Sequence, residues 1–418
     1  MARLSTGPHC WVVQRTLPVY SVTDAIPPCL PDWNRPCIRG ATSRDYSMFA
    51  YFENNYMWSS AVNLALMAGG DLGQIDRFLR PLKSQPPTPE AWLQAWVTLG
   101  EQQSTLAEKD IQRQFLASAS SRLLRAGIYT LTGERQMPPG PAKLEAYHTG
   151  CAAFRRGAAL LNPPLERVEI PSPDGPLPGY MVPPRNNSKG PVPTIIFYNG
   201  LDSTSEVLYG IIRNTFADVG IACLIVDTPG VGEAVRLLGI PSRNDYEVPT
   251  KAIADFLETR PDVDTARIGL LGISLGGYYA PRGASYEPRI KAVAAWGGVW
   301  DYGRLWKDRW EARTDRTSVP FWQLPFVMGT DDMEGALQRL AGFKLDEALP
   351  NLTQPFLILH GERDTIPLED AKAALAAAGS KDKELRFFSA EEGGCEHVGA
   401  DDPEPSRLFV LDWFLQKL

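Results

Sequence analysis

A serine between glycines, in the stretch GISLG at residues 272–276, constrains the fold of this chain more than any other feature of the sequence. An apolar run at 267–271 precedes Ser274, and residues 277–280, which favour a helix, follow it. This order predicts a nucleophile elbow, a tight strand-to-helix turn that exposes a reactive serine. The new helix would direct its first N–H groups, that of Leu275 in particular, at an oxyanion formed on the serine. The alternative is a chance glycine-serine turn, which would not need a strand before it and a helix after it.

Short apolar runs alternate with helical stretches through the second half of the chain. The runs lie at 168–170, 179–182, 194–198, 222–226, 268–271, 292–296, 356–359 and 385–388. Apolar strands that alternate with helices are typical of a parallel sheet covered on both faces, and the first two runs predict a β-hairpin. We therefore predict an α/β catalytic domain over residues 164–418, with a closing helix at 406–418. The tryptophan-rich segment 301–349 interrupts the alternation and is expected to form a helical cap.

The first part of the chain has a different character. Residues 1–45 are rich in proline, cysteine and arginine, which favours an irregular arm. Residues 46–163 show helical periodicity and no convincing strand, so we predict an all-helical domain of four or five helices. Three of its predicted helices cover residues 57–70, 107–132 and 144–161. A further helix is predicted to begin at residue 90, with Thr88 as its N-cap.

Composition narrows the classes of partner and cofactor. The net charge of −7, with no basic run, argues against a nucleic-acid partner. The sequence has no long apolar run and no signal-peptide pattern at its start, so we expect a cytoplasmic protein without a membrane span. The six cysteines are scattered without a C-x-x-C pair, which indicates free thiols and no metal site. The glycine-rich turn at 227–233 lacks the P-loop and dinucleotide-binding spacings, so no cofactor is expected.

Two polar residues that follow late strands complete a predicted catalytic triad. Asp364 lies just after the run 356–359, where the acid that orients a catalytic histidine belongs. Glu362 is the competing acid, and His360, at the strand end itself, is expected to be structural. His397 lies between the last strand and the last helix, on what we expect to be a flexible surface loop. Its imidazole suits a general base, and the order serine, acid, histidine is the one this fold uses.

The loop after the strand 194–198 is the predicted second half of an oxyanion hole. The sequence NGLDSTS follows that strand, and a glycine-containing turn can direct the N–H of Leu201 or Asp202 at a carbonyl oxygen on Ser274. Together with the N–H of Leu275, this would give two donors. A plain turn with an aspartate helix cap is the alternative.

Aromatic residues are dense in and just before the predicted cap. They are Trp296, Trp300, Tyr302, Trp306, Trp310, Phe321 and Trp322, and a helix of the first domain adds Tyr147 and His148. Such density predicts a pocket for a flat, conjugated substrate, lined by residues such as Trp300, Tyr147, His148 and Asp202. The alternative is that these rings pack the cap on the core.

Several stretches resemble one subgroup of the α/β-hydrolases. They are the helical first domain and residues 272–280 (GISLGGYYA), 287–289 (EPR), 295–298 (AWGG) and 358–361 (ILHG). The subgroup includes 2,6-dihydroxypseudooxynicotine hydrolase and the heptaketide-shortening and fusarin-type hydrolases of fungal polyketide pathways. The resemblance implies homodimers and a pocket between the two domains. One relative uses an extra acidic residue early in the cap, and Asp301 is the nearest candidate for it here. The first 45 residues have no counterpart in it.

The resemblance also implies a reaction. Members of the subgroup are expected to cleave a C–C bond next to a ketone in a 1,3-dicarbonyl substrate, or to act on polyketide acyl groups. The expected partner is thus a small aromatic or polyketide-like molecule. The same triad would serve a carboxylesterase or amidase, or a cyclising or condensing enzyme that uses His397 as its base. A non-catalytic binding protein is a further alternative, which the intact Ser274, Asp364 and His397 argue against.

Overall fold

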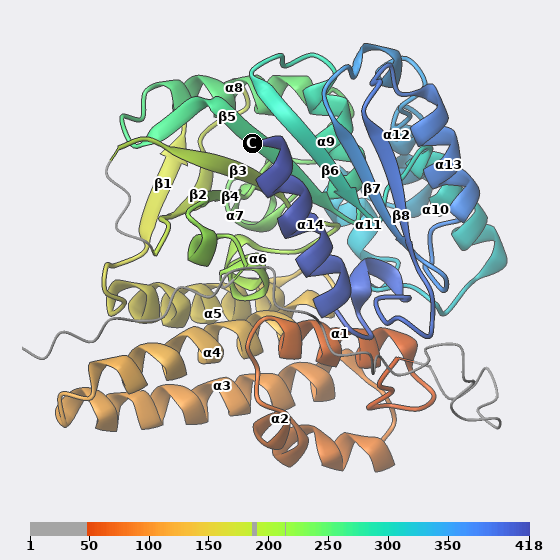
Figure 1. Cartoon of the computed structure of the whole chain (residues 1–418). Helices are drawn as coiled ribbons and strands as arrows, with labels where there is room; N and C mark the ends of the chain where they lie inside the picture. Colours follow the sequence, from red (N-terminus) through yellow and green to blue (C-terminus); the bar gives the residue numbers. More distant parts are fainter. Residues whose placement is uncertain (1–47, 186–189, 214) are drawn as a thin grey trace, which may run out of the picture. The chain divides into compact units, whose positions relative to one another are not determined.

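An eight-stranded sheet forms the core of the structure, a computed structural model that describes residues 48–185, 190–213 and 215–418. The strand order is β1-β2-β4-β3-β5-β6-β7-β8, with the β1–β2 and β2–β4 pairs antiparallel and the other pairs parallel. The strands are β1 (Glu166–Ile170), β2 (Leu177–Val182), β3 (Val192–Tyr198), β4 (Ala222–Val226), β5 (Val263–Ile273), β6 (Ile290–Trp296), β7 (Phe356–Gly361) and β8 (Lys383–Phe388). This is the predicted α/β-hydrolase fold, and the predicted β-hairpin is its β1–β2 edge (Figure 1).

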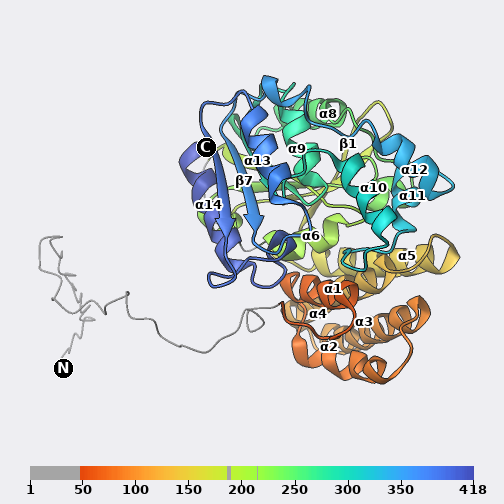
Figure 2. The ribbon, with the colours of Figure 1, turned by 90° about the vertical axis from the view of Figure 1, so that its right-hand side faces the viewer.

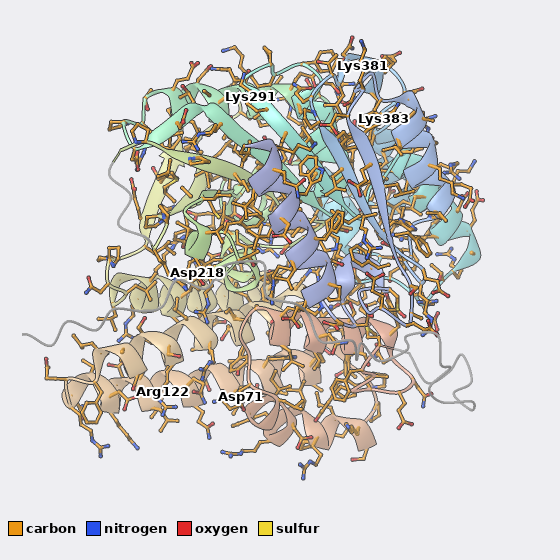
Figure 3. The ribbon with its side chains drawn as sticks, in the orientation of Figure 1. Asp71, Arg122, Asp218, Lys291, Lys381 and Lys383 are labelled. Carbon is orange, nitrogen blue, oxygen red and sulfur yellow. The ribbon has the colours of Figure 1, made fainter. Side chains whose placement is uncertain are left out.

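Burial along the strands explains why their sequences are apolar runs. Every residue of β4 is buried and β3 is buried almost throughout, because helices cover both faces of the sheet. The edge strand β1 instead alternates, with Val168 and Ile170 buried and its other residues exposed. Lys291 and Lys383 lie near the starts of β6 and β8, and both are exposed (Figure 3). The opposite, carboxyl-end edge carries Ser274, directly after β5.

Two hydrophobic clusters fill the space between the sheet and its helices. One joins the sheet to α8, α9, α13 and the cap, and the other joins it to α5, α6 and α14. Figure 2 shows α8, α9 and the cap helices α10–α12. These helices are α6 (Ser205–Ile212), α7 (Gly232–Arg236), α8 (Glu247–Glu258), α9 (Gly276–Ala284), α10 (Tyr302–Ala312), α11 (Gln323–Met328), α12 (Met333–Leu340), α13 (Leu368–Ala377) and α14 (Glu404–Lys417), with 3-10 turns η2 (Ala217–Val219), η3 (Leu349–Asn351) and η4 (His397–Gly399). None of the described helices is long and apolar enough to cross a membrane.

Five α-helices cover the described residues before β1, where the all-helical domain was predicted, and the predicted arm at residues 1–45 lies outside the described residues. The hydroxyl of Thr88 caps α3, as predicted, by accepting from the N–H of Ala91 at 3.2 Å. The helices are α1 (Tyr56–Met67), α2 (Leu72–Leu79), α3 (Pro89–Gln112), α4 (Leu116–Arg135) and α5 (Pro141–Ala159), with the 3-10 turn η1 (Arg80–Ser84).

One helix prediction in this domain is wrong. The segment 107–132 was expected to be one helix, but it contains the end of α3, a turn and most of α4. Gln114 adopts the left-handed conformation, with φ of 60°, and the N–H of Phe115 donates to the carbonyl of Asp110 at 2.8 Å. Neither glycine nor proline occurs at 113–115, so helical periodicity continues through the turn and hides it.

Candidate active site

Ser274 occupies a strained turn between β5 and α9. Its φ of 58° lies in the left-handed region, which costs a residue with a side chain about 1 kcal/mol or more. The glycines around it are needed for close packing, since a Cβ on Gly272 would lie 1.8 Å from the carbonyl oxygen of Gly276. A Cβ on Gly276 would lie 2.4 Å from the carbonyl oxygen of Tyr198 on the neighbouring strand. The GISLG stretch therefore forms the turn that its pattern predicted.

The side chains of Ser274, His397 and Asp364 form a hydrogen-bonded chain. The Oγ of Ser274 lies 2.8 Å from Nε2 of His397, and Nδ1 of His397 lies 2.7 Å from Oδ1 of Asp364. Burial opposes ionisation of Asp364, but the imidazole beside it and the N–H of Ile366, at 2.9 Å, hold the pKa of Asp364 below its usual value. Asp364 is therefore a carboxylate that can fix the orientation of His397. The competing acid, Glu362, accepts instead from the N–H of Ala390 at 2.8 Å.

The loop of His397 differs from the flexible surface loop expected from the sequence. His397 is buried, and the adjacent Val398 has a left-handed φ of 52°. The carboxylate of Asp401 accepts from the N–H groups of Cys395 and Glu396 at 3.1 and 2.9 Å. A Cβ on Gly297 would lie 3.1 Å from the imidazole carbon Cε1, so this glycine gives the ring room. The loop is thus held in place by its own polar contacts, which the flanking glycines did not reveal.

The predicted oxyanion loop lies directly against Ser274. A Cβ on Gly200 would be 2.9 Å from Cβ of Ser274, so the backbone approaches closely only because residue 200 is glycine. The next residue, Leu201, is buried, and Asp202 has a left-handed φ of 51°. On the other side of Ser274, the N–H groups of Gly277 and Tyr278 donate within the turn, to Ser274 and Leu275 carbonyls. That the N–H groups of Leu201 and Leu275 donate to an oxyanion is still a prediction.

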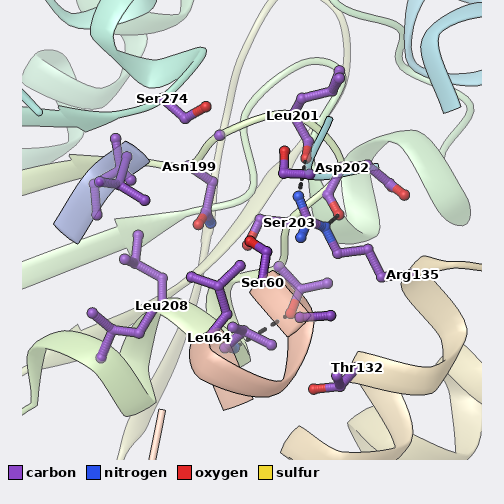
Figure 4. Close-up of a pocket in the computed structure, with 18 of the residues that line it drawn as sticks. Ser60, Leu64, Thr132, Arg135, Asn199, Leu201, Asp202, Ser203, Leu208 and Ser274 are labelled. Atoms are coloured by element: carbon purple, nitrogen blue, oxygen red, sulfur yellow. Dashed lines mark hydrogen bonds between the residues drawn. The ribbon is translucent and has the colours of Figure 1, made fainter. Parts of the chain in front are cut away.

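A cavity lies over Ser274 and His397 (Figure 4). Helices α1 and α4 form one wall with Ser60, Leu64 and Thr132, and the loop after β3 lies across from them. The apolar part of the lining is aliphatic, and includes Leu64, Leu131, Val207, Leu208, Ile211 and Ile273. Apart from the imidazole of His397, no aromatic ring of the described residues lines it.

The prediction of an aromatic pocket is therefore wrong, because most of these rings pack the cap and the helices instead. Tyr147 is fully buried against Leu131 and Cys151, outside the cavity. His148 is exposed on α5, and Trp300 packs against the hydrophobic core. Of the four pocket residues proposed from the aromatic pattern and the loop, only Asp202 lines the cavity.

Asp301 is also not part of the site. Its Oδ1 accepts from the N–H of Arg304 at 2.8 Å and caps α10, and its Oδ2 pairs with Lys344 at 3.2 Å. A capping carboxylate satisfies the first N–H groups of a helix. The acidic residue early in the cap is thus structural here, and it does not line the cavity that contains Ser274.

The resemblance implied a pocket between the two domains, but sequence reasoning did not identify the residues of the helical domain that line it. Arg135, the last residue of α4, lines the cavity and donates from Nε and Nη2 to the carbonyls of Asp202 and Leu201, each at 3.0 Å. It thereby holds the loop beside Ser274 from the other domain. No motif surrounds Arg135 in the sequence, so only the packing of α4 on the loop could identify it.

A buried ion network lies next to this loop. The carboxylate of Glu134 contacts Lys143 at 2.9 Å and Arg236 at 2.8 Å, and that of Asp202 contacts the same two cations at 3.3 and 2.7 Å. All four side chains are almost completely buried. Charges in such a place are tolerated only when they are paired, so the network ties α4 and α5 to the loop and to α7.

Comparison with known proteins now places the chain in a family. Residues 89–302, half of the chain, match the family described as Esterase FrsA-like. The chain belongs to this family. The FrsA-like chain is 30% identical over 339 residues to 2,6-dihydropseudooxynicotine hydrolase of Paenarthrobacter nicotinovorans. The matched residues cover 79% of this chain and 86% of that protein. It is 32% identical to 20-hydroxy-prefusarin hydrolase FUS2 of Gibberella moniliformis, over 53% of this chain and 55% of that one.

A solved structure supports the same relationship. The crystal structure of 2,6-dihydroxy-pseudo-oxynicotine hydrolase matches this FrsA-like chain with a TM-score of 0.73 at 26% identity, over 85% of this chain and 95% of that one. The resemblance drawn from the sequence is therefore confirmed, and the chain is an α/β-hydrolase.

Proposed function

We propose that this protein is a serine hydrolase that cleaves a C–C bond next to a ketone, or another acyl bond, in a polyketide-like substrate. The observation that carries the proposal is the chain of hydrogen bonds from Ser274 through His397 to Asp364, at 2.8 and 2.7 Å, beneath a cavity. The names of two relatives, a 2,6-dihydropseudooxynicotine hydrolase and a 20-hydroxy-prefusarin hydrolase, support hydrolysis of a metabolite of this kind.

The proposed reaction on a 1,3-diketone proceeds in two stages. In the first, Nε2 of His397 takes the hydroxyl proton while Oγ of Ser274 bonds to a ketone carbon, and the carbonyl electrons move to its oxygen. The N–H groups of Leu275 and Leu201 donate to this oxyanion. When the carbonyl re-forms, the electron pair of the C–C bond passes to the α-carbon and is delocalised onto the second carbonyl as an enolate. The imidazolium returns its proton to that carbon, which leaves as a ketone.

The second stage releases the acyl group from Ser274. His397 takes a proton from water, the water oxygen bonds to the acyl carbon, and the serine oxygen leaves with the proton from the imidazolium. The products are a ketone and a carboxylic acid. An ester or amide would react by the same steps with an oxygen or nitrogen leaving group, which is why a carboxylesterase is the main competing function.

The lining of the cavity bears on the substrate. Its aliphatic side chains, such as Leu64, Leu131 and Leu208, favour a partly reduced acyl chain over a flat aromatic ring. We therefore expect the acyl portion of the substrate to be aliphatic. This expectation replaces the conjugated substrate that the aromatic residues of the cap suggested.

A substrate panel tests this function. Wild type, Ser274→Ala and His397→Ala would be assayed with acyclic 1,3-diketones of increasing alkyl length and with 4-nitrophenyl esters of the same acyl groups. The proposal expects diketone cleavage that both substitutions abolish. Fast ester hydrolysis without diketone cleavage would support a carboxylesterase. Turnover that survives Ser274→Ala but not His397→Ala would indicate base-catalysed cyclisation or condensation and contradict the proposal.

We also propose that the chain forms a homodimer, as the family resemblance implies, and that it is cytoplasmic, as we expect from its sequence. Sedimentation equilibrium of the purified protein should give twice the chain mass of 46.1 kDa. A single-chain mass at all concentrations would contradict the dimer, and fractionation of producing cells would test the location.

A further inference from the structure

The guanidinium of Arg135 lines the cavity without a carboxylate partner. Its Nε and Nη2 donate to the backbone carbonyls of Asp202 and Leu201, which are neutral acceptors. Within the described part of the chain, Nη1 has no hydrogen-bond partner and no carboxylate forms an ion pair with Arg135. Arginine stays protonated in proteins, so a positive charge reaches the cavity with donor capacity left over.

The nearby acids do not neutralise this charge, because other cations already hold them. Glu134 and Asp202 each contact both Lys143 and Arg236, so two carboxylates face two cations and the network is neutral by itself. Arg135 adds one positive charge next to it. Burial lowers the pKa of Arg135, as expected for a guanidinium removed from water. A bound anion would offset that cost.

A second donor faces the same cavity without an acceptor. The side chain of Asn199 is 2% exposed, and its Nδ2 has no hydrogen-bond partner among the described residues. Figure 4 shows the amide of Asn199 in the space between Ser274 and Ser60, with Arg135 on the same cavity. Buried polar atoms are normally satisfied, so a cavity with two unused donors suits a ligand that supplies acceptors. The guanidinium makes a negatively charged oxygen the preferred acceptor.

We propose that Arg135 and Asn199 form a subsite that binds an anionic oxygen of the substrate. This oxygen is either a carboxylate that the substrate carries or the enolate oxygen that forms when the C–C bond breaks. The inference rests on the proposed function, because it places the anionic oxygen on a molecule whose carbonyl Ser274 attacks. It narrows the substrate class to acyl compounds with an acidic group, or to diketones whose leaving enolate Arg135 stabilises.

Two matched substrate pairs distinguish the sources. For a carboxylate, 4-nitrophenyl hydrogen glutarate is compared with its methyl ester, which lacks the charge but keeps the chain. For an enolate, a 1,3-diketone is compared with the 4-nitrophenyl ester of the same acyl group, whose leaving group does not need Arg135. The kinetic constants would be measured for wild type, Arg135→Gln, Arg135→Lys and the control Arg125→Gln. Arg125 lies on the same helix, contacts Ser121 at 3.2 Å and does not line the cavity.

If a carboxylate binds, Arg135→Gln should lose the preference for the charged glutarate by about tenfold to a hundredfold, mainly through KM. If an enolate binds, the same substitution should lower kcat on the diketone by a similar factor relative to the ester. Arg135→Lys keeps the charge and should recover part of either effect. If Arg135→Gln does not fold, Arg135→Lys is measured in its place. Arg125→Gln should change neither ratio. If Arg135 only holds the loop, both substrates of each pair slow equally and the proposal is overturned.

A binding measurement separates this inference from the proposed function. Monomethyl glutarate would be titrated calorimetrically into Ser274→Ala and into Ser274→Ala with Arg135→Gln. At least about tenfold weaker binding to the second protein supports the subsite even if no substrate is turned over. Equal binding to both proteins, together with unchanged kinetic ratios, would overturn it. If the tenfold difference in binding is observed but no substrate is turned over, the proposed function is contradicted and the anion subsite is not.

Discussion

Nε2 of His397 lies 2.8 Å from Oγ of Ser274, although 123 positions separate the two residues in the sequence. Three loops at the carboxyl ends of β5, β7 and β8 bring this pair and Asp364 together. The helical domain adds Arg135, which fixes the backbone of the loop beside Ser274.

Gly200→Ala tests the close approach of the loop to the nucleophile. The added Cβ would lie 2.9 Å from Cβ of Ser274, so the loop must move away and the donor at Leu201 moves with it. We expect kcat to fall by roughly 10²–10³-fold, the usual effect of losing one oxyanion donor. Gly73→Ala is the matched control, because its Cβ would make only an ordinary contact, 3.4 Å from Asp71. Steady-state kinetics and thermal denaturation of both variants measure the effect. A kcat for Gly200→Ala equal to that of Gly73→Ala would contradict the prediction.

Lys143→Met tests the buried ion network. Removing this ammonium leaves the carboxylates of Glu134 and Asp202 with Arg236 as their remaining ion-pair partner in the network. Breaking a buried pair in this way should lower the free energy of unfolding by about 3–5 kcal/mol. Lys251→Met removes an exposed lysine paired with Asp255 at 2.7 Å, and should cost at most about 1 kcal/mol. Urea denaturation measures the free energy of unfolding of both variants. A similar decrease in the two variants would show that the buried network does not stabilise the protein more than an exposed ion pair does.

Asp301→Ala tests the conclusion that this acid is structural. The substitution removes the cap of α10 and the partner of Lys344, and should cost about 1 kcal/mol of stability. The kcat/KM should stay unchanged because Asp301 does not line the cavity above Ser274. Asp301→Asn keeps a capping oxygen and should restore most of the stability. A large loss of kcat/KM with normal stability would instead return Asp301 to the catalytic site.

The buried carboxyl of Asp227 predicts a pH dependence of stability. Burial and the nearby Glu206 carboxylate raise the pKa of Asp227 to about 7, against about 3.9 for an unfolded aspartate. The unfolded chain therefore releases this proton first as the pH rises, so the stabilising contribution of Asp227 is present at low pH and is lost as the pH rises through about 7.

Comparison with Asp227→Asn isolates this contribution. The amide cannot titrate, so the free energy of unfolding should fall less steeply between pH 5 and pH 8 than in wild type. The variant should also be less stable overall, because the carboxylate accepts from Ser205 and from the N–H of Glu233, at 2.7–2.8 Å. Urea titrations at several pH values give both quantities. Identical pH slopes would show that Asp227 ionises normally in the folded protein.

The sequence predicted those features that depend on local pattern. The period of apolar residues located the strands, and glycines around Ser274 located the turn, because tight backbone contacts allow no side chain there. The proximity of Ser274, Asp364 and His397 followed from the rule that loops at the carboxyl ends of parallel strands meet, and their order in the chain is the one this fold uses. None of these inferences needed knowledge of how the helical domain packs.

The features that the sequence did not predict depend on packing between distant segments. Trp306 and Tyr147 could either line a pocket or fill a core, and both are buried in hydrophobic clusters. Arg135 carries no motif and becomes part of the site only because α4 lies across the loop after β3. Asn199 belongs to the predicted oxyanion loop, but the sequence did not single out its side chain. The turn at Gln114 was hidden because neither glycine nor proline marks it.

The most direct test of the central claim is covalent labelling of Ser274. Wild type, Ser274→Ala and His397→Ala would be treated with a fluorophosphonate, digested, and analysed by peptide mass spectrometry. We expect one phosphonylated residue, Ser274, in wild type, no adduct in Ser274→Ala, and much slower labelling in His397→Ala. A wild-type protein that stays unlabelled at Ser274, or an adduct that persists at another residue in Ser274→Ala, would contradict it.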